Sequence, residues 1–282
     1  PLANTARAAP AGGATLSTKG FERVSRLFER VSGIRLTTAK HALVVSRLQR
    51  LALEAGETNL DRYVERLDGG DLASSQLTQV IDRLTTNETY FFREPDHFEH
   101  FSRWMSENPG RRWQVWSGAS SSGEEIYSLA MVMAERLGIG PGSPDWSIVG
   151  TDLSTAMVDH ARRGLYSLHR TDGITPALLK RWCLKGTGEY DGTLLIDRRL
   201  RQRTRFETLN LMQPIPDAMG PFDAIWLRNV LIYFDPETKA QIVRRVLGRL
   251  APHGVLYTGH AESLSNLDLP VRTIAPAVYV HA

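Results

Sequence analysis

The first 86 residues carry a repeated helical pattern of apolar side chains. Apolar residues recur three and four positions apart, a spacing that places them on one face of a helix. Gly33 is expected to end the first helix, and the second is expected to run from about 38 to 55. The residues predicted to face inward are Phe21, Val24, Leu27, Phe28 and Val31, then Leu43, Val44, Leu48 and Leu51, then Leu60, Tyr63, Val64 and Leu67, then Leu77, Val80, Ile81 and Leu84. Residues 16–86 are therefore predicted to form an all-helical N-terminal domain.

From residue 95 the pattern changes to strands that alternate with helices. Pro95 stands at a position typical of a first helical turn, and Ser154 and Asp235 are expected to begin two further helices. Predicted strands cover 113–116, 146–150, 205–208, 222–227 and 254–259; predicted helices cover 124–137, the segment after Ser154, and a segment after Asp235 that buries Ile242, Val243, Val246 and Leu250; the segments 271–274 and 277–280 are expected to form a hairpin. This alternation predicts an α/β domain over 95–282, built on a mostly parallel sheet covered on both faces.

One segment of this domain does not follow the strand–helix rhythm. Residues 186–192 are rich in turn formers, and the stretch Thr193 to Leu200 alternates apolar and polar side chains. Turn residues followed by alternation are typical of antiparallel strands. We therefore expect a small antiparallel β-subdomain, over about 186–206, inserted in the main domain.

Composition narrows the class of protein. With 42% hydrophobic and 23% charged residues, the chain resembles an ordinary globular protein. The single cysteine, Cys183, excludes an internal disulfide framework and a cysteine-based zinc site. No apolar run reaches the roughly 18 residues that a membrane span needs. Residues 1–15 are rich in Ala, Pro, Gly and Thr, which favours a disordered tail over a signal peptide. We therefore expect a cytoplasmic protein.

The charge is basic but small, at +3, and by itself does not indicate a nucleic-acid partner. Basic residues gather between Lys19 and Arg66, where they include Arg47 and Arg50 on the second helix. One interpretation is a set of solvated helix faces. The other is a docking face for an acidic protein surface.

A turn rich in small residues follows the first predicted strand. It runs from Gly118 to Gly123 in the sequence WSGASSSGEE, and small residues allow a ligand to approach the backbone closely. A purely structural tight turn would read the same way. Asp152 ends the next strand, where an acidic residue can accept hydrogen bonds from ribose hydroxyls. No GxxxxGK[ST] motif is present, which disfavours a triphosphate ligand.

Three further segments contribute polar residues. Residues 87–94 link the two domains and begin with the motif NETYFFR, whose aromatic residues are expected mostly to pack while Asn87, Thr89 and Arg93 need polar partners. Asn229 and Tyr233 follow a third strand in the motif LRNVLIYFD, and Asn210 with Leu211 follows the short strand 205–208. Ligands of open α/β sheets bind outside the carboxyl ends of the strands, so these segments predict one site. His260 and Glu262 are expected to shape a loop beside this site rather than bind a metal.

Together these motifs resemble the CheR family of chemotaxis receptor glutamate methyltransferases. The resemblance covers roughly residues 21–280 and depends on NETYFFR, WSGASSSGEE, GTD (150–152), LRNVLIYFD and GHAES (259–263). Gly118 departs mildly from the family's pattern, because relatives carry alanine at that position. The resemblance implies a Rossmann-like S-adenosylmethionine-dependent methyltransferase domain with a β-subdomain inserted, preceded by an all-α N-terminal domain. A C-terminal hairpin is typical of this variant of the doubly wound fold.

The resemblance also implies roles for individual residues. Contacts to S-adenosylmethionine, or to its product S-adenosylhomocysteine, are implied for Asn87, Thr89, Arg93, Glu124, Asp152, Asn210, Leu211, Arg228 and Asn229, beside the turn at Gly118. Arg93 and Tyr233 would lie nearest the transferred methyl group. Arg47 and Arg50 would face the receptor's acidic helical bundle, and in some members the β-subdomain docks a peptide at the receptor C-terminus. The chain is expected to act as a monomer, without a metal, nucleic acid or membrane insertion.

The expected reaction is methyl transfer to receptor glutamates. A glutamate with a pKa of about 4.3 is ionised near pH 7, so no general base is required and the enzyme must chiefly align the reactants. Two alternatives remain open at this stage. One is a methyltransferase of another acceptor, and the other is a non-catalytic scaffold that binds S-adenosylmethionine.

Overall fold

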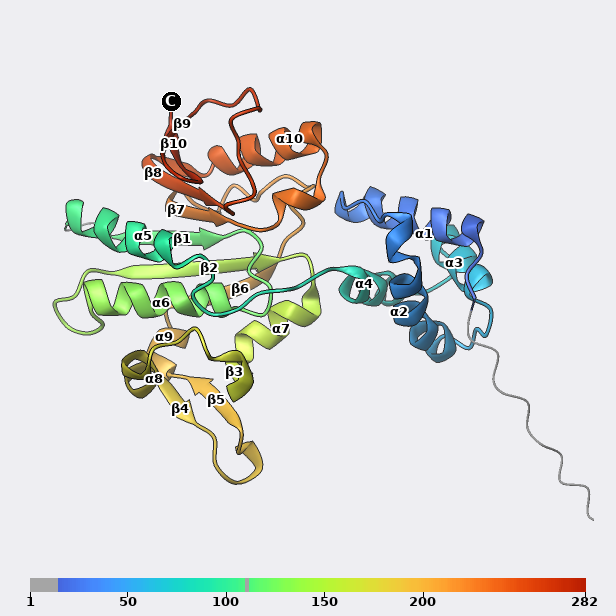
Figure 1. The fold of residues 1–282 in the computed structure, drawn as a ribbon, viewed down its shortest axis with the longest axis horizontal. Helices are drawn as coiled ribbons and strands as arrows, with labels where there is room; N and C mark the ends of the chain where they lie inside the picture. The colour runs from blue at the N-terminus through green and yellow to red at the C-terminus, as the bar shows by residue number, and fades with distance from the viewer. Residues whose placement is uncertain (1–14, 110–111) are drawn as a thin grey trace, which may run out of the picture. The chain divides into compact units, whose positions relative to one another are not determined.

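The computed structural model describes residues 15–109 and 112–282, and the chain divides into two compact units (Figure 1). One unit runs to Arg30 and continues over Arg35–Leu84; the other comprises Val31–Ile34 and Thr85–Ala282. The predicted tail over 1–15 lies outside the described residues except for Thr15. The predicted linker 87–94 belongs to the second unit.

The described residues of the first unit form four α-helices and a short 3₁₀ turn. They are α1 (Thr18–Ser32), η1 (Thr38–Lys40), α2 (His41–Glu54), α3 (Leu60–Gly69) and α4 (Ser74–Leu84). Asn59 caps α3 by accepting a hydrogen bond from the Arg62 amide at 3.0 Å. The predicted inward position of Leu43 is wrong, since its exposed fraction is 39%. Val44, Leu48 and Leu51 form the buried face of α2, and Leu43 lies about 100° away from Val44 around the helix.

The second unit contains a seven-stranded sheet in the order β6-β2-β1-β7-β8-β10-β9. The strands are β1 (Trp113–Ser117), β2 (Trp146–Asp152), β6 (Thr204–Thr208), β7 (Phe222–Leu227), β8 (Leu250–Thr258), β9 (Val271–Ala275) and β10 (Val278–His281). The first five strands in this order are parallel, and β10 runs antiparallel between β8 and β9. The predicted parallel sheet with a C-terminal hairpin is confirmed.

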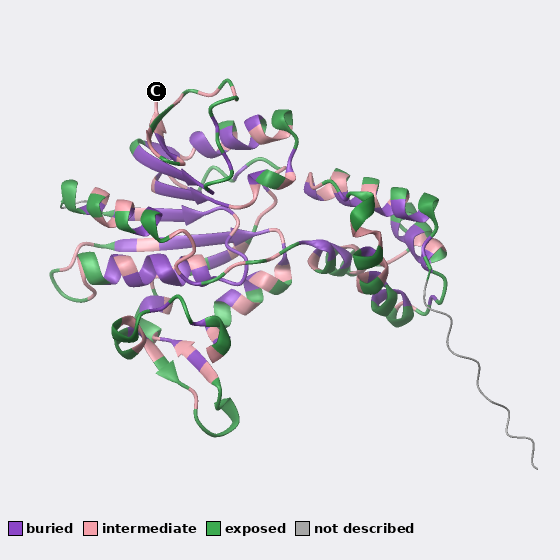
Figure 2. Ribbon diagram, viewed as in Figure 1, coloured by how far each residue is buried: buried purple, intermediate pink, exposed green. Residues whose placement is uncertain are grey.

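Helices cover both faces of this sheet, as the buried strands in Figure 2 indicate. The helices are α5 (Pro95–Glu107), α6 (Glu124–Leu137), α7 (Thr155–Arg163) and α10 (Pro236–Leu247). Strand β7 shows the division: Ala224 and Trp226 pack with α5, α6 and α7, whereas Ile225 and Leu227 pack with α10. No helix among the described residues has the length and apolarity needed to cross a membrane.

Leu250 does not lie in α10 as the apolar spacing predicts. The helix ends at Leu247, and Leu250 begins strand β8 opposite Phe222. The Phe222 amide donates to the Arg249 carbonyl at 2.8 Å, which draws this segment into the sheet. The Leu250 side chain therefore packs in the same core as the residues of α10, but from a strand.

The inserted subdomain begins earlier than predicted and ends before 206. Its three antiparallel strands are β3 (Leu165–Ser167), β4 (Cys183–Lys185) and β5 (Thr193–Ile196), in the order β3-β5-β4. They carry η2 (Leu168–Arg170), α8 (Pro176–Trp182) and η3 (Gly188–Tyr190), and α9 (Arg198–Arg201) leads back to the main sheet. We call residues 165–196 the insert. Strands β3 and β4 have only three residues each, too few for a visible alternation, and β6 pairs with β2 in the main sheet.

Candidate functional site

The carboxyl ends of four parallel strands meet at one edge of the main sheet. Strands β6, β2, β1 and β7 are neighbours, so the segments after them lie side by side. The Gly118 amide donates to the Trp226 carbonyl at 2.8 Å, and the Ser120 amide donates to the Thr151 carbonyl at 2.9 Å. These bonds join the turn after β1 to both neighbouring strands. The structure therefore brings together the segments that the sequence predicted to converge.

The turn after β1 follows a backbone path that few residues adopt. Ser121 and Gly123 have positive φ angles of 47° and 97°. A Cβ atom on Gly123 would lie 2.8 Å from Cβ of Ala161, so no side chain fits there. The hydroxyl of Ser120 is buried and has no hydrogen-bond partner among the described residues. A ligand at this turn would satisfy it, since buried hydroxyls seek a partner.

Asp152 is fixed against this turn. Its carboxylate is buried and accepts hydrogen bonds from the amides of Ser121 at 2.8 Å and Ser154 at 2.9 Å. Charge-assisted bonds from two backbone amides hold the carboxylate in one orientation. The glycine-rich turn and the acidic residue thus lie together, as a ribose-binding arrangement requires.

The linker segment 87–94 packs against the same turn. The hydroxyl of Ser121 donates to the Asn87 carbonyl at 3.1 Å. Phe91 is buried against Tyr166, with ring centroids 5.0 Å apart, and the Phe92 ring packs on the main core. Tyr90 is exposed. Two of the three aromatic residues of NETYFFR therefore pack, which confirms the expectation that most of them would.

Arg93 and Tyr233 lie within electrostatic reach of each other. Burial raises the pKa of Tyr233, and the positive charge of Arg93 acts in the opposite direction. The guanidinium of Arg93 donates to the Glu88 carbonyl at 3.1 Å and lies 5.6 Å from the Tyr90 ring centroid. A raised pKa keeps the Tyr233 hydroxyl protonated at neutral pH.

The side chain of Arg228 is committed to a buried network, with an exposed fraction of 1%. Its guanidinium donates to the Glu125 carboxylate at 2.9 Å and to the Arg93 carbonyl at 2.6 Å, and it lies 3.1 Å from Nδ1 of His97. This network fixes the linker to the first turn of α6. Any contact between Arg228 and a cofactor therefore has to come from its backbone.

Glu262 organises the loop that carries Asn229 and Tyr233. Its buried carboxylate accepts hydrogen bonds from the amides of Asn229 at 2.6 Å, Gly259 at 2.7 Å and Ile232 at 3.1 Å. Burial raises its pKa. Asn229 has a positive φ of 57°, a strained conformation that this carboxylate helps to hold. The prediction that Glu262 shapes a loop beside the site is confirmed.

Three potential metal ligands, Glu94, His97 and His260, lie within 4.8 Å of one another. The Arg228 guanidinium already brings a positive charge to this cluster, since Nη1 is 3.8 Å from the Glu94 carboxylate. Burial and Arg228 lower the pKa of His97 to about 4. The ring of His260 instead pairs with Asp96 at 2.9 Å.

Asn210 and Leu211 follow strand β6 at the same edge. The side-chain oxygen of Asn210 accepts from the Met212 amide at 2.9 Å, and its amide nitrogen donates to the Val31 carbonyl, in the same unit, at 2.6 Å. Leu211 is buried near the turn, where a Cβ atom on Gly118 would lie 3.8 Å from its Cδ2. Both polar atoms of the Asn210 side chain are thus hydrogen-bonded within the second unit.

Glu124 is completely buried, with an exposed fraction of 0%. One carboxylate oxygen accepts from the Ser122 hydroxyl at 2.6 Å, and the other accepts from the Arg170 guanidinium at 2.7 Å. The same guanidinium nitrogen donates to the Thr89 carbonyl at 3.1 Å. Arg170 was not predicted from the sequence, because it lies in the insert, 46 residues after Glu124, and no local motif marks it.

The two arginines predicted to dock a receptor lie on α2 in the helical unit. Arg50 is well exposed, at 76%, and pairs with Glu54 at 2.7 Å. Arg47 donates to the Arg83 carbonyl at 2.8 Å and so also joins α2 to the end of α4. Arg50 is therefore the freer of the two to meet a partner.

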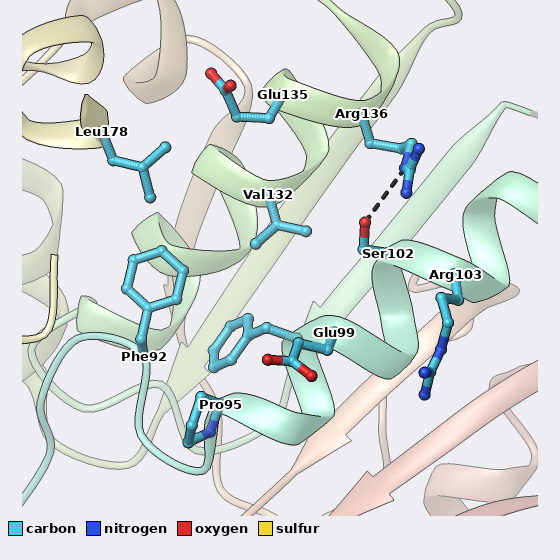
Figure 3. A pocket seen from close by; sticks show the side chains of 10 residues that line it. Phe92, Pro95, Glu99, Ser102, Arg103, Val132, Glu135, Arg136 and Leu178 are labelled. Carbon is cyan, nitrogen blue, oxygen red and sulfur yellow. Dashed lines mark hydrogen bonds between the residues drawn. The ribbon is translucent and has the colours of Figure 1, made fainter. Parts of the chain in front are cut away.

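A cavity of 630 Å³ lies elsewhere, between α5, α6 and α8 (Figure 3). Its lining includes Phe92, Val132 and Leu178, and Arg136 donates to the Ser102 hydroxyl at 3.2 Å across one side. Val132 is about two helical turns from the start of α6, away from the strand ends. None of the predicted site residues lines this cavity.

Comparison with known families identifies the two units. Residues 87–279 match the family model "CheR methyltransferase, SAM binding domain", and residues 19–85 match "CheR methyltransferase, all-alpha domain". The chain belongs to the CheR methyltransferase family. A CheR protein carries a site for S-adenosylmethionine, so this chain is an S-adenosylmethionine-dependent methyltransferase. The buried, unpartnered hydroxyl of Ser120 beside Asp152 fits a polar cofactor at the glycine-rich turn.

Individual relatives agree with this assignment to the CheR family. A chemotaxis protein methyltransferase of Escherichia coli strain K12 is 38% identical over 253 residues, covering 90% of this chain and 87% of the relative. One from Salmonella typhimurium is 37% identical over 252 residues, covering 89% and 86%. Chemotaxis protein methyltransferase 2 of Pseudomonas aeruginosa is 35% identical over 262 residues, covering 92% and 91%.

Proposed function

We propose that this chain transfers a methyl group from S-adenosylmethionine to glutamate side chains in the cytoplasmic domains of chemotaxis receptors. The products are glutamate methyl esters and S-adenosylhomocysteine. The observation that carries the proposal is the grouping of Arg93 and Tyr233 at the strand ends that also hold the turn 118–123 and Asp152. Relatives named chemotaxis protein methyltransferases support the choice of acceptor. Action on cytoplasmic domains implies a cytoplasmic enzyme.

The cofactor would be held by groups from five segments of the second unit. Asp152 would bind the ribose or the amino group, the backbone at Asn210 and Leu211 would meet the adenine, and Ser120 would give its unpartnered hydroxyl. Residues from three segments complete the proposed set. These segments are the linker with Asn87, Thr89 and Arg93, the turn after β1 with Gly118 and Glu124, and the backbone at Arg228 and Asn229. When bound, S-adenosylmethionine supplies a methyl group that is already electrophilic.

The protein's part in the reaction is alignment. The acceptor carboxylate is ionised at neutral pH, since its ordinary pKa is about 4.3, so the chain needs no general base and no metal for this step. Arg93 and the protonated hydroxyl of Tyr233 would orient the carboxylate for in-line displacement. Carboxylate and sulfonium both lose their charge in the reaction. Arg93 should therefore hold the acceptor only moderately, because tight charge pairing would favour the ground state.

Two surfaces would meet the receptor. Arg50, with Arg47 beside it, would face an acidic helical bundle of the receptor. On the insert, Leu184 and Tyr190 are exposed apolar side chains, which supports docking of a receptor C-terminal peptide there. We propose that the enzyme works as a monomer on this substrate.

Methylation with labelled cofactor tests the proposed function. Purified protein is incubated with labelled S-adenosylmethionine and a receptor cytoplasmic domain, and we expect label that is released by mild base, as a glutamate methyl ester requires. Label on another acceptor would indicate a different methyltransferase. Cofactor binding without any label would indicate a scaffold, and either result would contradict the proposal.

Arg93→Ala tests the proposed orientation of the acceptor. We expect turnover to fall about 100-fold, the scale of a lost positioning contact, while the cofactor dissociation constant changes comparatively little. Arg103→Ala, at an exposed arginine of α5, is the matched control and should leave turnover unchanged. Full activity of Arg93→Ala would show that this role is wrong.

A further inference from the structure

The insert is attached to the proposed cofactor site by a compact set of contacts. The Tyr166 hydroxyl donates to the Ser122 carbonyl at 2.7 Å, at the glycine-rich turn. Gly173 packs against the linker so closely that a Cβ atom there would lie 2.1 Å from the Phe91 carbonyl oxygen. Residues 166–173 of the insert therefore contact both the turn and the linker.

Arg170 joins these two contacts with one guanidinium nitrogen. This nitrogen lies 2.7 Å from the Glu124 carboxylate and 3.1 Å from the Thr89 carbonyl. Glu124 is fully buried, whereas the Arg170 side chain is 47% exposed, so the cation reaches a buried carboxylate from the surface of the insert. A buried carboxylate without a cationic partner is costly, so Glu124 depends on this arginine.

We propose that Arg170 is a positioning residue that couples the insert to the cofactor site. It acts through Glu124 at the start of α6 and through the linker at Thr89, both of which belong to the proposed cofactor-binding set. The inference therefore rests on the proposed function. Coupling between two sites is reciprocal, so cofactor binding should in turn order the insert.

Another arginine of the insert provides a matched control. Arg181 on α8 pairs with Glu135 of α6 at 2.6 Å, and Glu135 lines the cavity in Figure 3. Arg170 and Arg181 thus both form an ion pair between the insert and α6, with a fully buried carboxylate at Glu124 and a partly exposed one at Glu135. The partners lie 11 residues apart on that helix, about 16 Å along its axis. Only the Arg170 pair lies at the strand ends.

Calorimetric titration of the full chain with S-adenosylmethionine tests the proposal. We expect Arg170→Ala to raise the dissociation constant about tenfold, the scale of one lost hydrogen bond to a charged group, with a higher KM for cofactor and little change in kcat. Arg170→Lys keeps the charge and should stay within about threefold of the wild-type value. Arg181→Ala should bind as the wild type does.

Hydrogen exchange supplies a readout that a merely structural role would not change. We expect the cofactor to protect backbone amides of 165–173 in the wild type and in Arg181→Ala, but not in Arg170→Ala. If Arg170→Ala does not unfold cooperatively, Arg170→Gln replaces it, because glutamine retains a donor for Thr89 without the charge. Unchanged affinity in the Arg170 variants, or an equal loss in Arg181→Ala, would overturn the inference. Absence of cofactor binding by the wild type would instead contradict the proposed function.

Discussion

Buried charges, each with several partners, define the site at the scale of single residues. The Glu262 carboxylate accepts hydrogen bonds from three backbone amides. The Arg228 guanidinium contacts a carboxylate, a backbone carbonyl and an imidazole. Glu124 is held by Ser122 and Arg170. A buried charge in a low-dielectric interior is tolerated only when such partners satisfy it. These residues therefore fix the loops on which the proposed cofactor contacts depend.

Arg228→Met should destabilise the protein strongly. The substitution leaves the Glu125 carboxylate and the Arg93 carbonyl without their buried cation, a loss of about 3–5 kcal/mol in the free energy of unfolding. Urea denaturation measures it. Arg112→Met removes an exposed ion pair with Asp145 and should cost at most about 1 kcal/mol. Equal effects of the two variants would show that the buried network contributes little.

His97 should make stability depend on pH. Its pKa of about 4 in the folded protein lies below its ordinary value of 6.5, so the unfolded chain binds more protons between these values. Stability is therefore fully present above pH 6.5 and falls as the pH decreases toward 4, by about 3 kcal/mol.

Denaturation at several pH values measures this contribution. In His97→Gln the fall between pH 6.5 and 4 should be smaller, because the group that takes up the proton is gone. His253→Gln, at an exposed histidine, should retain the wild-type dependence. A His97→Gln curve parallel to that of the wild type would refute the assignment.

At the scale of elements, the site is made by the segments at the carboxyl end of each strand. The turn between β1 and α6 and the loop between β7 and α10 carry residues that we propose for cofactor binding and catalysis, while the strands supply a rigid edge. The longer helices and strands were predictable because they have enough residues for the apolar pattern to repeat. The insert was misplaced because its first two strands have three residues each, too few to show an alternating pattern. Its predicted end at 206 also overlaps β6, which pairs with β2 in the main sheet.

Gly123→Ala should disturb the junction of β1 and α6. Gly123 has a φ of 97°, and a Cβ atom would lie 2.8 Å from Ala161 and 2.9 Å from the Tyr166 hydroxyl. Strain and crowding together should cost about 1–3 kcal/mol. Thermal unfolding of the variant measures this cost. Gly70→Ala is the control, because Gly70 has a similar φ of 79° and open space around it. The loss of stability in this variant gives the cost of the backbone strain without the cost of crowding.

At the scale of the whole molecule, the chain combines a helical unit with a methyltransferase unit. The catalytic groups we propose all lie in the second unit, whereas the basic residues proposed to meet the receptor lie in the first. Kinetic measurements should therefore distinguish substitutions that weaken receptor binding from substitutions that slow the methyl transfer itself.

Arg50→Glu should weaken receptor methylation without affecting the cofactor. Charge reversal on an exposed docking residue should lower kcat/KM for the receptor domain about tenfold at low salt, and the loss should shrink as ionic strength rises. Steady-state methylation at several salt concentrations measures both effects. Arg112→Glu reverses an exposed charge in the other unit and serves as the control. A salt-independent loss, or the same loss in the control, would contradict the docking role.

The sequence alone determined the fold class, the convergence of the strand-end segments and the family, because periodicity and local motifs are encoded over short distances. NETYFFR and LRNVLIYFD identified the chemistry without any coordinates. Tertiary structure decided which side chains are free to act. It commits the Arg228 side chain to a buried network and buries Glu124 beneath Arg170, a partner 46 residues away. Such pairings depend on which segments meet in space, and no spacing along the chain records that.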